Sequence, residues 1–210
     1  LLISSFIFSD SIKFNNPNNH GVIGLINIPT ARFYEESSSA FTVYRGDPDR
    51  KIAITMMPYD WLEASVFYTS IKDRPYGGGF DQDYKDKGFN AKFRLKSEGY
   101  FPAIAIGFND LAGTGIYSSE YIVGSYGIDN LDMHLGIGWG KLNGGPFQYD
   151  NPLGDLNDSF LTRCLSWGCD NDNDQGGDNS SMPDAPLPSP FFDLEISLGI
   201  HHMWLYHAAG

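Results

Sequence analysis

Hydrophobic and polar residues alternate with a period of two through the middle of the chain. Over residues 88–96, four apolar side chains alternate with four polar or basic ones, and similar alternation recurs over 102–110 and 131–140. A period of two places successive side chains on opposite faces of an extended strand. Weaker versions of the pattern predict further strands, which cover residues 39–45, 51–57, 62–70, 119–126 and 191–200.

Two features favour a membrane barrel over a soluble sandwich. Several of these strands have about 9–10 residues, the span of a tilted transmembrane strand. Their less apolar faces carry glycine, alanine or charge, as at Gly136, Gly138 and Gly140. We therefore predict an all-β fold: an antiparallel outer-membrane-type β-barrel, or its first strands as an open, curved meander sheet. The side chains expected to face lipid are Phe89, Phe93, Met133, Leu135 and Ile137, and those expected to face the lumen are Lys92, Arg94 and His134.

Short and long connections alternate between the predicted strands. The short links are 58–61, 97–101 and 127–130, and the other set is 46–50, 71–87, 111–118 and 141–190. Bacterial outer-membrane barrels join their strands by short periplasmic turns and longer extracellular loops. We therefore expect 71–87 and 141–190 to lie outside the cell.

The chain divides into five parts on this interpretation. Residues 1–9 resemble the remnant of a signal peptide, and residues 10–38 form a lead-in to the sheet. The β-meander follows over residues 39–140. Residues 141–190 form a long acidic loop that we expect to be extracellular, and residues 191–210 hold the last strand and an atypical end. We expect that end to reflect a truncated or frameshifted reading frame. The sheet is accordingly predicted to stay open, with the last strand unpaired to the first.

Composition narrows the function classes. Hydrophobic residues make up 41% and aromatic residues 15% of the 210 residues, with 24 glycines, but no apolar run approaches the 18 residues of a membrane helix. The net charge of −12 argues against nucleic-acid binding, which needs clustered basic residues. Aromatic residues near strand ends suit a girdle at the membrane interfaces; they are Trp61, Tyr68, Tyr100, Phe101, Tyr117, Tyr121 and Trp139.

Few residues are candidates for a disulfide, a metal site or catalysis. Cys164 and Cys169 could form a local disulfide or remain free thiols. The acidic run from Asp170 to Gly176 fails the EF-hand spacing, and His201, His202 and His207 lack the spacing of a zinc motif. Glu63 and Glu120 are candidates for a lumen-facing pair, although a salt bridge to Arg94 or Lys92 is the better interpretation. We expect no enzyme activity, metal or cofactor.

Several segments resemble the YjbH/GfcD-like family of exopolysaccharide- and capsule-associated outer-membrane β-barrel proteins, often lipoproteins. The resemblance runs through residues 20–32, 58–63, 84–95, 102–107, 110–115, 118–121 and 136–140. It implies a non-catalytic role in exopolysaccharide or capsule biosynthesis and export, in the outer membrane of a Gram-negative bacterium. The implied partners are outer-membrane lipid, extracellular polysaccharide and other export proteins.

The sequence departs from the family in showing no lipobox cysteine near residue 10, so lipid anchoring is left open. Two other functions stay open. A general porin or solute channel would need an open aqueous path. A carbohydrate-active enzyme would need two carboxylates facing each other across a cleft.

Overall fold

The computed structural model describes residues 15–47, 49–75, 83–111, 116–142, 152–156, 189–198 and 201–207. In these ranges the chain is all-β apart from one short 3₁₀ turn, η1 (Pro152–Asp155). No helix in the described ranges is long and apolar enough to cross a bilayer. Both cysteines of the predicted disulfide, Cys164 and Cys169, lie outside the described residues.

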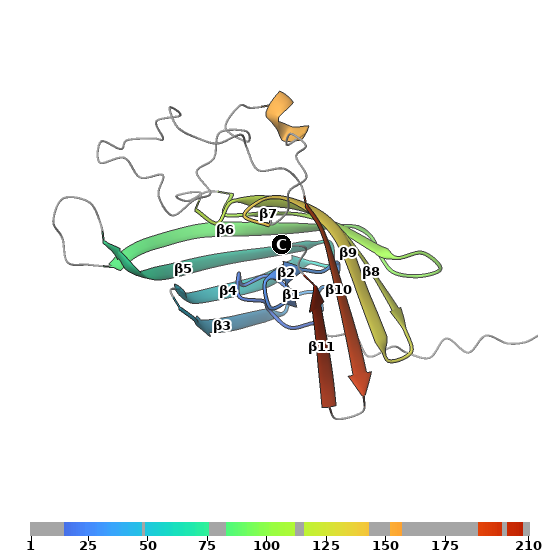
Figure 1. The fold of residues 1–210 in the computed structure, drawn as a ribbon. Helices are drawn as coiled ribbons and strands as arrows, with labels where there is room; N and C mark the ends of the chain where they lie inside the picture. The colour runs from blue at the N-terminus through green and yellow to red at the C-terminus, as the bar shows by residue number, and fades with distance from the viewer. Residues whose placement is uncertain are drawn as a thin grey trace, which may run out of the picture.

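Nine strands form one antiparallel meander sheet, in which each strand pairs with its neighbours in the chain (Figure 1). They are β3 (Ser39–Arg45), β4 (Asp49–Tyr59), β5 (Leu62–Pro75), β6 (Asp83–Lys96), β7 (Ala103–Asn109), β8 (Ser119–Ile128), β9 (Leu131–Gly140), β10 (Ser189–Leu198) and β11 (His201–His207). Among the described residues, β3 pairs with β4 alone and β11 with β10 alone. The sheet is therefore open, as the sequence predicted.

The sequence predicted two strand boundaries wrongly, at the 71–87 connection and at the end of the last strand. The expected 71–87 connection is mostly strand, because the β5–β6 ladder continues through Ser70↔Lys85 and Ile71↔Tyr84 and, after an irregularity, reaches Pro75↔Asp83. The expected last strand, 191–200, ends at Leu198, and β11 follows it. The period-two signal failed in β11 because the apolar run from Met203 to Tyr206 does not alternate.

A small hairpin precedes the sheet. Strands β1 (Gly24–Leu25) and β2 (Ile28–Pro29) pair with each other and belong to residues 15–38, which we call the N-terminal segment. Figure 1 shows this hairpin inside the curve of the large sheet. The face of the sheet that the N-terminal segment contacts is called the inner face, and the opposite face the outer face.

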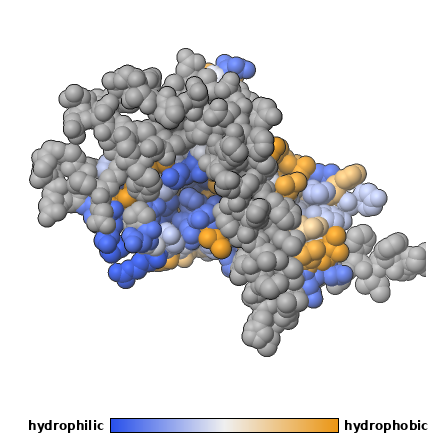
Figure 2. Space-filling model, viewed as in Figure 1, coloured by the Kyte–Doolittle hydropathy of each residue, from blue (hydrophilic) through white to orange (hydrophobic). Residues whose placement is uncertain are grey.

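The two faces have opposite polarity to those of a soluble protein. Polar residues of the inner face are buried, including Lys51, Thr55, Glu63, Thr69, Asn90, Lys92, Asp132 and His134. Large apolar side chains of the outer face are exposed, including Phe41, Val43, Ile52, Ile54, Phe89, Leu135 and Ile137. In Figure 2, hydrophilic residues gather in the middle of the view, while hydrophobic residues lie toward the right edge.

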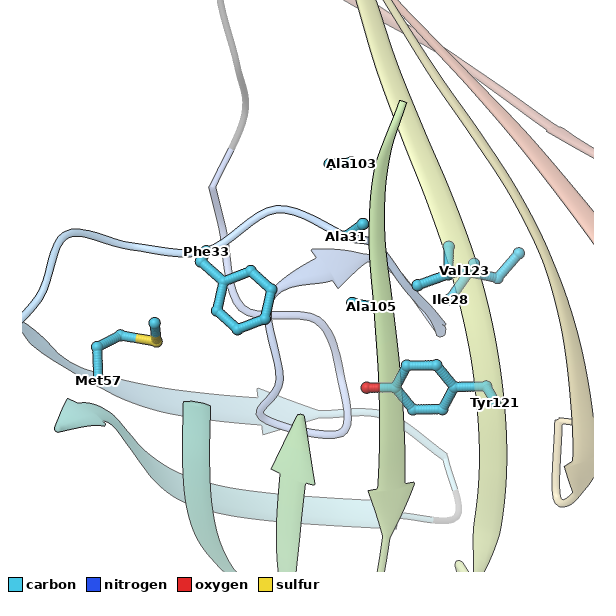
Figure 3. Packing of buried hydrophobic residues seen from close by; sticks show 8 residues of the cluster. All are labelled: Ile28, Ala31, Phe33, Met57, Ala103, Ala105, Tyr121 and Val123. Atoms are coloured by element: carbon cyan, nitrogen blue, oxygen red, sulfur yellow. The ribbon is translucent and has the colours of Figure 1, made fainter. Parts of the chain in front are cut away.

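A compact apolar cluster joins the N-terminal segment to the sheet. Ile28, Ala31 and Phe33 pack with Met57 of β4 and with small and aromatic residues of β7 and β8 (Figure 3). The residues from β7 and β8 are Ala103, Ala105, Tyr121 and Val123. The alanines of β7 provide the space into which the N-terminal segment packs. One apolar core is therefore the interface between the segment and the sheet, and a second, smaller one consists of Ala53, Phe67, Ile71 and Tyr117.

Candidate functional site

A fully buried ion pair lies at the centre of the inner face. Glu63 of β5 and Lys92 of β6 are directly opposite in the ladder, and Lys92 Nζ lies 2.8 Å from Glu63 Oε2, with both side chains inaccessible. Lys92 Nζ also donates to the carbonyls of Ile23 at 3.0 Å and Arg32 at 2.9 Å. The Ile23 N–H donates to Glu63 Oε1 at 2.9 Å. The pair is thus completed by backbone groups of the N-terminal segment, which satisfies the charges that burial would otherwise destabilise.

A second ionic contact anchors the end of the segment. Arg32 donates to both carboxylate oxygens of Asp132 on β9, from Nε at 2.9 Å and from Nη2 at 2.5 Å. Its Nη1 lies 2.5 Å from Glu98 Oε2, in the connection after β6. The planar guanidinium suits such a two-pronged carboxylate contact. Arg32 thereby links strands that are far apart in the sequence.

Neutral groups extend this network to β8. The Ala31 N–H donates to Ser125 Oγ at 2.8 Å, and Ser125 Oγ lies 2.7 Å from His134 Nδ1 on the adjacent strand. A hydroxyl that accepts from Ala31 can still donate one proton or accept a second, so the direction of the Ser125–His134 hydrogen bond follows the His134 tautomer. His134 is therefore part of the surface that receives the N-terminal segment.

The start of the segment is held by β4 and β6. Thr55 Oγ1 donates to the Gly21 carbonyl at 2.5 Å, and Asn90 Nδ2 donates to the His20 carbonyl at 2.9 Å. Gly21 has a φ of 76°, and a Cβ at this position would come within 2.4 Å of the Ala53 Cβ. Only glycine meets both the backbone and the space requirement here. The segment is therefore closely matched to the inner face at several points between His20 and Phe33.

A separate aromatic and charged group lies near the other end of β4. Lys51 Nζ is 3.9 Å from the ring centroid of Tyr117 and 4.7 Å from that of Phe67. Tyr117 donates its hydroxyl proton to Asp49 Oδ2 at 2.6 Å. The charge of Lys51 is therefore met by two aromatic rings, and the Tyr117 hydroxyl by a carboxylate, within the same group of residues.

The structure brings most of the residues singled out in the sequence to this inner face. Lys92 and His134 are buried there, and Arg94 is half-buried with its guanidinium 4.5 Å from the Phe33 ring centroid. Of the salt bridges expected between Glu63 or Glu120 and Arg94 or Lys92, the structure shows the one between Glu63 and Lys92. Leu135 is 61% and Phe89 54% exposed on the outer face, while Phe93 and Met133 are half-buried there.

Two aromatic residues of the expected girdle lie elsewhere. Tyr117 and Tyr121 are only 3% exposed and face the interior, where Tyr121 joins the apolar cluster and Tyr117 contacts Lys51. Trp61, Tyr68, Tyr100 and Phe101 are exposed. Position near a strand end did not distinguish inward from outward tyrosines, because the facing of each side chain depends on its parity within the strand.

Sequence reasoning missed Arg32, Asp132, Glu98 and Ser125. Asp132 and Ser125 stand at polar positions of alternating strands, a signal that places them on the inner face. Nothing in the local pattern marks Arg32 as their partner, since it is 100 residues from Asp132. In the described ranges, no group of three or more histidine, cysteine or acidic side chains is placed to hold a metal ion.

The geometry defines a class of protein: an all-β chain whose open antiparallel sheet carries a charged, buried face completed by its own N-terminal segment. Residues 16–181 match the model of the YjbH family, described as exopolysaccharide biosynthesis protein YbjH, and the chain belongs to this family. It is 35% identical over 176 residues to the uncharacterized lipoprotein YjbH of Escherichia coli (strain K12). That match covers 80% of this chain and 24% of the relative, so the chain spans about a quarter of the relative's length. No solved structure matches.

Proposed function

We propose that this chain forms a sector of an outer-membrane β-barrel, with its N-terminal segment inside, that serves exopolysaccharide biosynthesis or export without catalysing a reaction. The observation that carries the proposal is the inverted polarity of the sheet: charged residues are buried and large apolar residues are exposed. A soluble sheet exposes its polar face, whereas a membrane strand turns its apolar face to lipid.

Strand length supports a membrane span. Strands β4, β5, β6, β8 and β9 have 11, 14, 14, 10 and 10 residues. A tilted transmembrane strand needs about 9–11 residues. Since lipid does not satisfy unpaired backbone groups, the proposal requires partner strands for the edges β3 and β11.

Aromatic residues on the outer face support an interface with lipid headgroups near the short turn between β4 and β5. The rings of Tyr59 and Trp61 are stacked with centroids 5.4 Å apart, and Trp61 and Phe93 follow at 6.3 Å. Tyr59 is 53% and Trp61 46% exposed. Amphipathic aromatic rings at the ends of membrane strands are typical of the boundary between hydrocarbon and water.

Family membership supports the role in exopolysaccharide biosynthesis, and the lipoprotein relative supports an association with a membrane. A non-catalytic role is supported by the engagement of the buried carboxylates: Glu63 is bound to Lys92 and Asp132 to Arg32. The alternative function, a porin or solute channel, is less favoured because the N-terminal segment occupies the inner face.

A pair of arginine substitutions tests the proposal. Leu135→Arg places a charge on the exposed outer face, and Gly136→Arg places one on the buried inner face of the same strand. If Leu135 lies near the bilayer midplane, Leu135→Arg should cost about 2–4 kcal/mol of folding free energy in lipid vesicles. The measurement is urea unfolding in vesicles, combined with fractionation of cell membranes on a sucrose gradient.

The two variants should differ in their dependence on lipid. Leu135→Arg should unfold more readily in vesicles than in detergent micelles, where headgroups can adapt to the charge. Gly136→Arg should be equally harmful in both media, because it crowds the buried inner face. Full stability of Leu135→Arg in vesicles, or recovery of the protein away from the outer-membrane fraction, would contradict the proposal.

A further inference from the structure

The strongest unexplained feature of the inner face is a polar cavity beside Arg94. It encloses about 200 Å³ between the N-terminal segment and the end of β6. Its lining residues are Asn15, Ala31, Arg32 and Phe33 from the segment, Arg94 from β6, Ser97 and Glu98 from the following connection, and Ala103 from β7. This volume is below that of pockets for drug-sized ligands, so it suits one small group such as a single sugar residue.

The two arginines of the cavity differ in their partners. Arg32 is bound by Asp132 and Glu98. Arg94 has its guanidinium over the Phe33 ring, at 4.5 Å, and forms no ion pair or side-chain hydrogen bond with any residue in the described ranges. Its five N–H donors are therefore available, although the side chain is half-buried.

The residues that line the cavity limit which class of ligand it can bind. An unpaired guanidinium recognises a planar carboxylate through two parallel hydrogen bonds. Glu98 adds a negative charge to the same wall, which disfavours a doubly charged phosphate but accepts hydroxyl protons. Ser97 can donate to and accept from hydroxyl groups. The Phe33 ring already contacts two cations, Lys92 at 4.6 Å and Arg94 at 4.5 Å from its centroid, so the proposal does not use it as a stacking surface for the sugar.

We propose that this cavity binds a carboxylate-bearing sugar residue, a uronic acid, with its carboxylate on Arg94 and its hydroxyls on Ser97 and Glu98. The choice of a saccharide rests on the proposed function, whereas the anion site rests on the cavity alone. A purely structural role of Arg94 is the competing explanation. Three cations, Lys92, Arg32 and Arg94, face three anions, Glu63, Glu98 and Asp132, so Arg94 could serve only to balance charge.

Binding to the full chain, folded in detergent micelles, tests the proposal. Glucuronic acid, glucose and inorganic phosphate are each titrated by calorimetry into the wild type, Arg94→Lys, Arg94→Gln and Lys87→Gln. Glucuronic acid should bind the wild type saturably and at least tenfold more tightly than glucose or phosphate. Arg94→Lys keeps the charge but loses the planar fork, so it should fold normally and bind at least tenfold more weakly. Lys87→Gln, which removes an exposed charge from the same strand, should bind like the wild type.

Two results would overturn the site. Equal binding of glucuronic acid by the wild type and Arg94→Gln would exclude Arg94 as the ligand group. Absence of glucuronic acid binding, together with a lower stability of Arg94→Gln that Arg94→Lys restores, would establish charge balance as the role of Arg94. Equal affinity for phosphate would overturn the sugar assignment. Vesicle insertion of the same preparation is measured separately, so failure of the barrel proposal would not be mistaken for failure of the site.

Discussion

Replacing Lys92 by methionine should release the N-terminal segment from the sheet. The substitution preserves side-chain length but removes the only cation within ion-pair distance of Glu63 in the described part of the chain. It also removes one of the donors to the Ile23 carbonyl and the side-chain donor to the Arg32 carbonyl. Breaking a buried pair by removing one partner costs about 3–5 kcal/mol, because the remaining charge is left uncompensated. The loss of stability should be local, at the contacts between the Glu63–Lys92 pair and the N-terminal segment.

Hydrogen exchange measures that local loss directly. The Ile23 N–H donates to Glu63 and the Ala31 N–H to Ser125, so both amides report on whether the segment is docked. A cost of about 3–5 kcal/mol corresponds to roughly 10²- to 10⁴-fold faster exchange through the local opening. Amides in the centres of β5 and β6 should change less, because their ladder hydrogen bonds are retained.

A double variant separates the charge effect from lost packing. In Glu63→Gln/Lys92→Met neither member of the pair is charged, and the glutamine oxygen can still accept from the Ile23 N–H. The cost should fall to about 1–3 kcal/mol, the penalty for the Arg32 carbonyl that loses its donor, because the Ile23 carbonyl still accepts from the Thr30 N–H at 3.2 Å. Lys87→Met, an exposed position in β6, is the matched control and should leave exchange unchanged. If Lys92→Met exchanges like the wild type, or if the double variant is no more stable than Lys92→Met, the reasoning is wrong.

Two further predictions concern space and pH. Gly107→Ala would bring a Cβ within 2.2 Å of the buried Tyr121 ring and should cost about 1–3 kcal/mol, whereas Gly124→Ala, whose nearest neighbour is 3.7 Å away, should unfold at the same urea concentration as the wild type. Burial, with Lys51 nearby, lowers the pKa of His20 from 6.5 to about 3. The unfolded chain therefore binds a proton below pH 6.5 that the folded chain does not, so stability should decrease from pH 6.5 towards pH 3. His20→Gln should reduce that slope in urea unfolding, and an unchanged slope would contradict the assignment.

Much of the sheet could be predicted because period-two alternation is a local signal. The strands 39–45 and 131–140 have their predicted limits, and the outward exposure of Leu135 follows from the same pattern. Even the pairing of Glu63 with Lys92 was foreseeable, since opposite charges at inward positions of neighbouring strands lie opposite one another when the register allows it. The limits of β5 and β6 were less predictable, because the residues near 71–87 are polar on both faces.

The role of the N-terminal segment was not foreseeable from local sequence. Residues 10–38 were interpreted as a lead-in, yet residues 15–38 supply the hydrogen bonds and apolar contacts that complete the inner face. Those contacts join residues 40 to 100 positions apart. An irregular segment has no periodic pattern that predicts which surface it will cover. Its contacts depend on the three-dimensional placement of several strands at once.

The sequence by itself determined that the chain forms strands and which side chains share a face, because alternation along an extended backbone fixes both. Only the tertiary structure decided that the polar face is covered by the chain's own N-terminal segment. Lys92, Arg32 and Asp132 can be buried as charges because backbone carbonyls, opposite charges and strand neighbours meet them at hydrogen-bond distance. That compensation exists only when the N-terminal segment lies against the folded sheet, since burial without it would cost more than the contacts return.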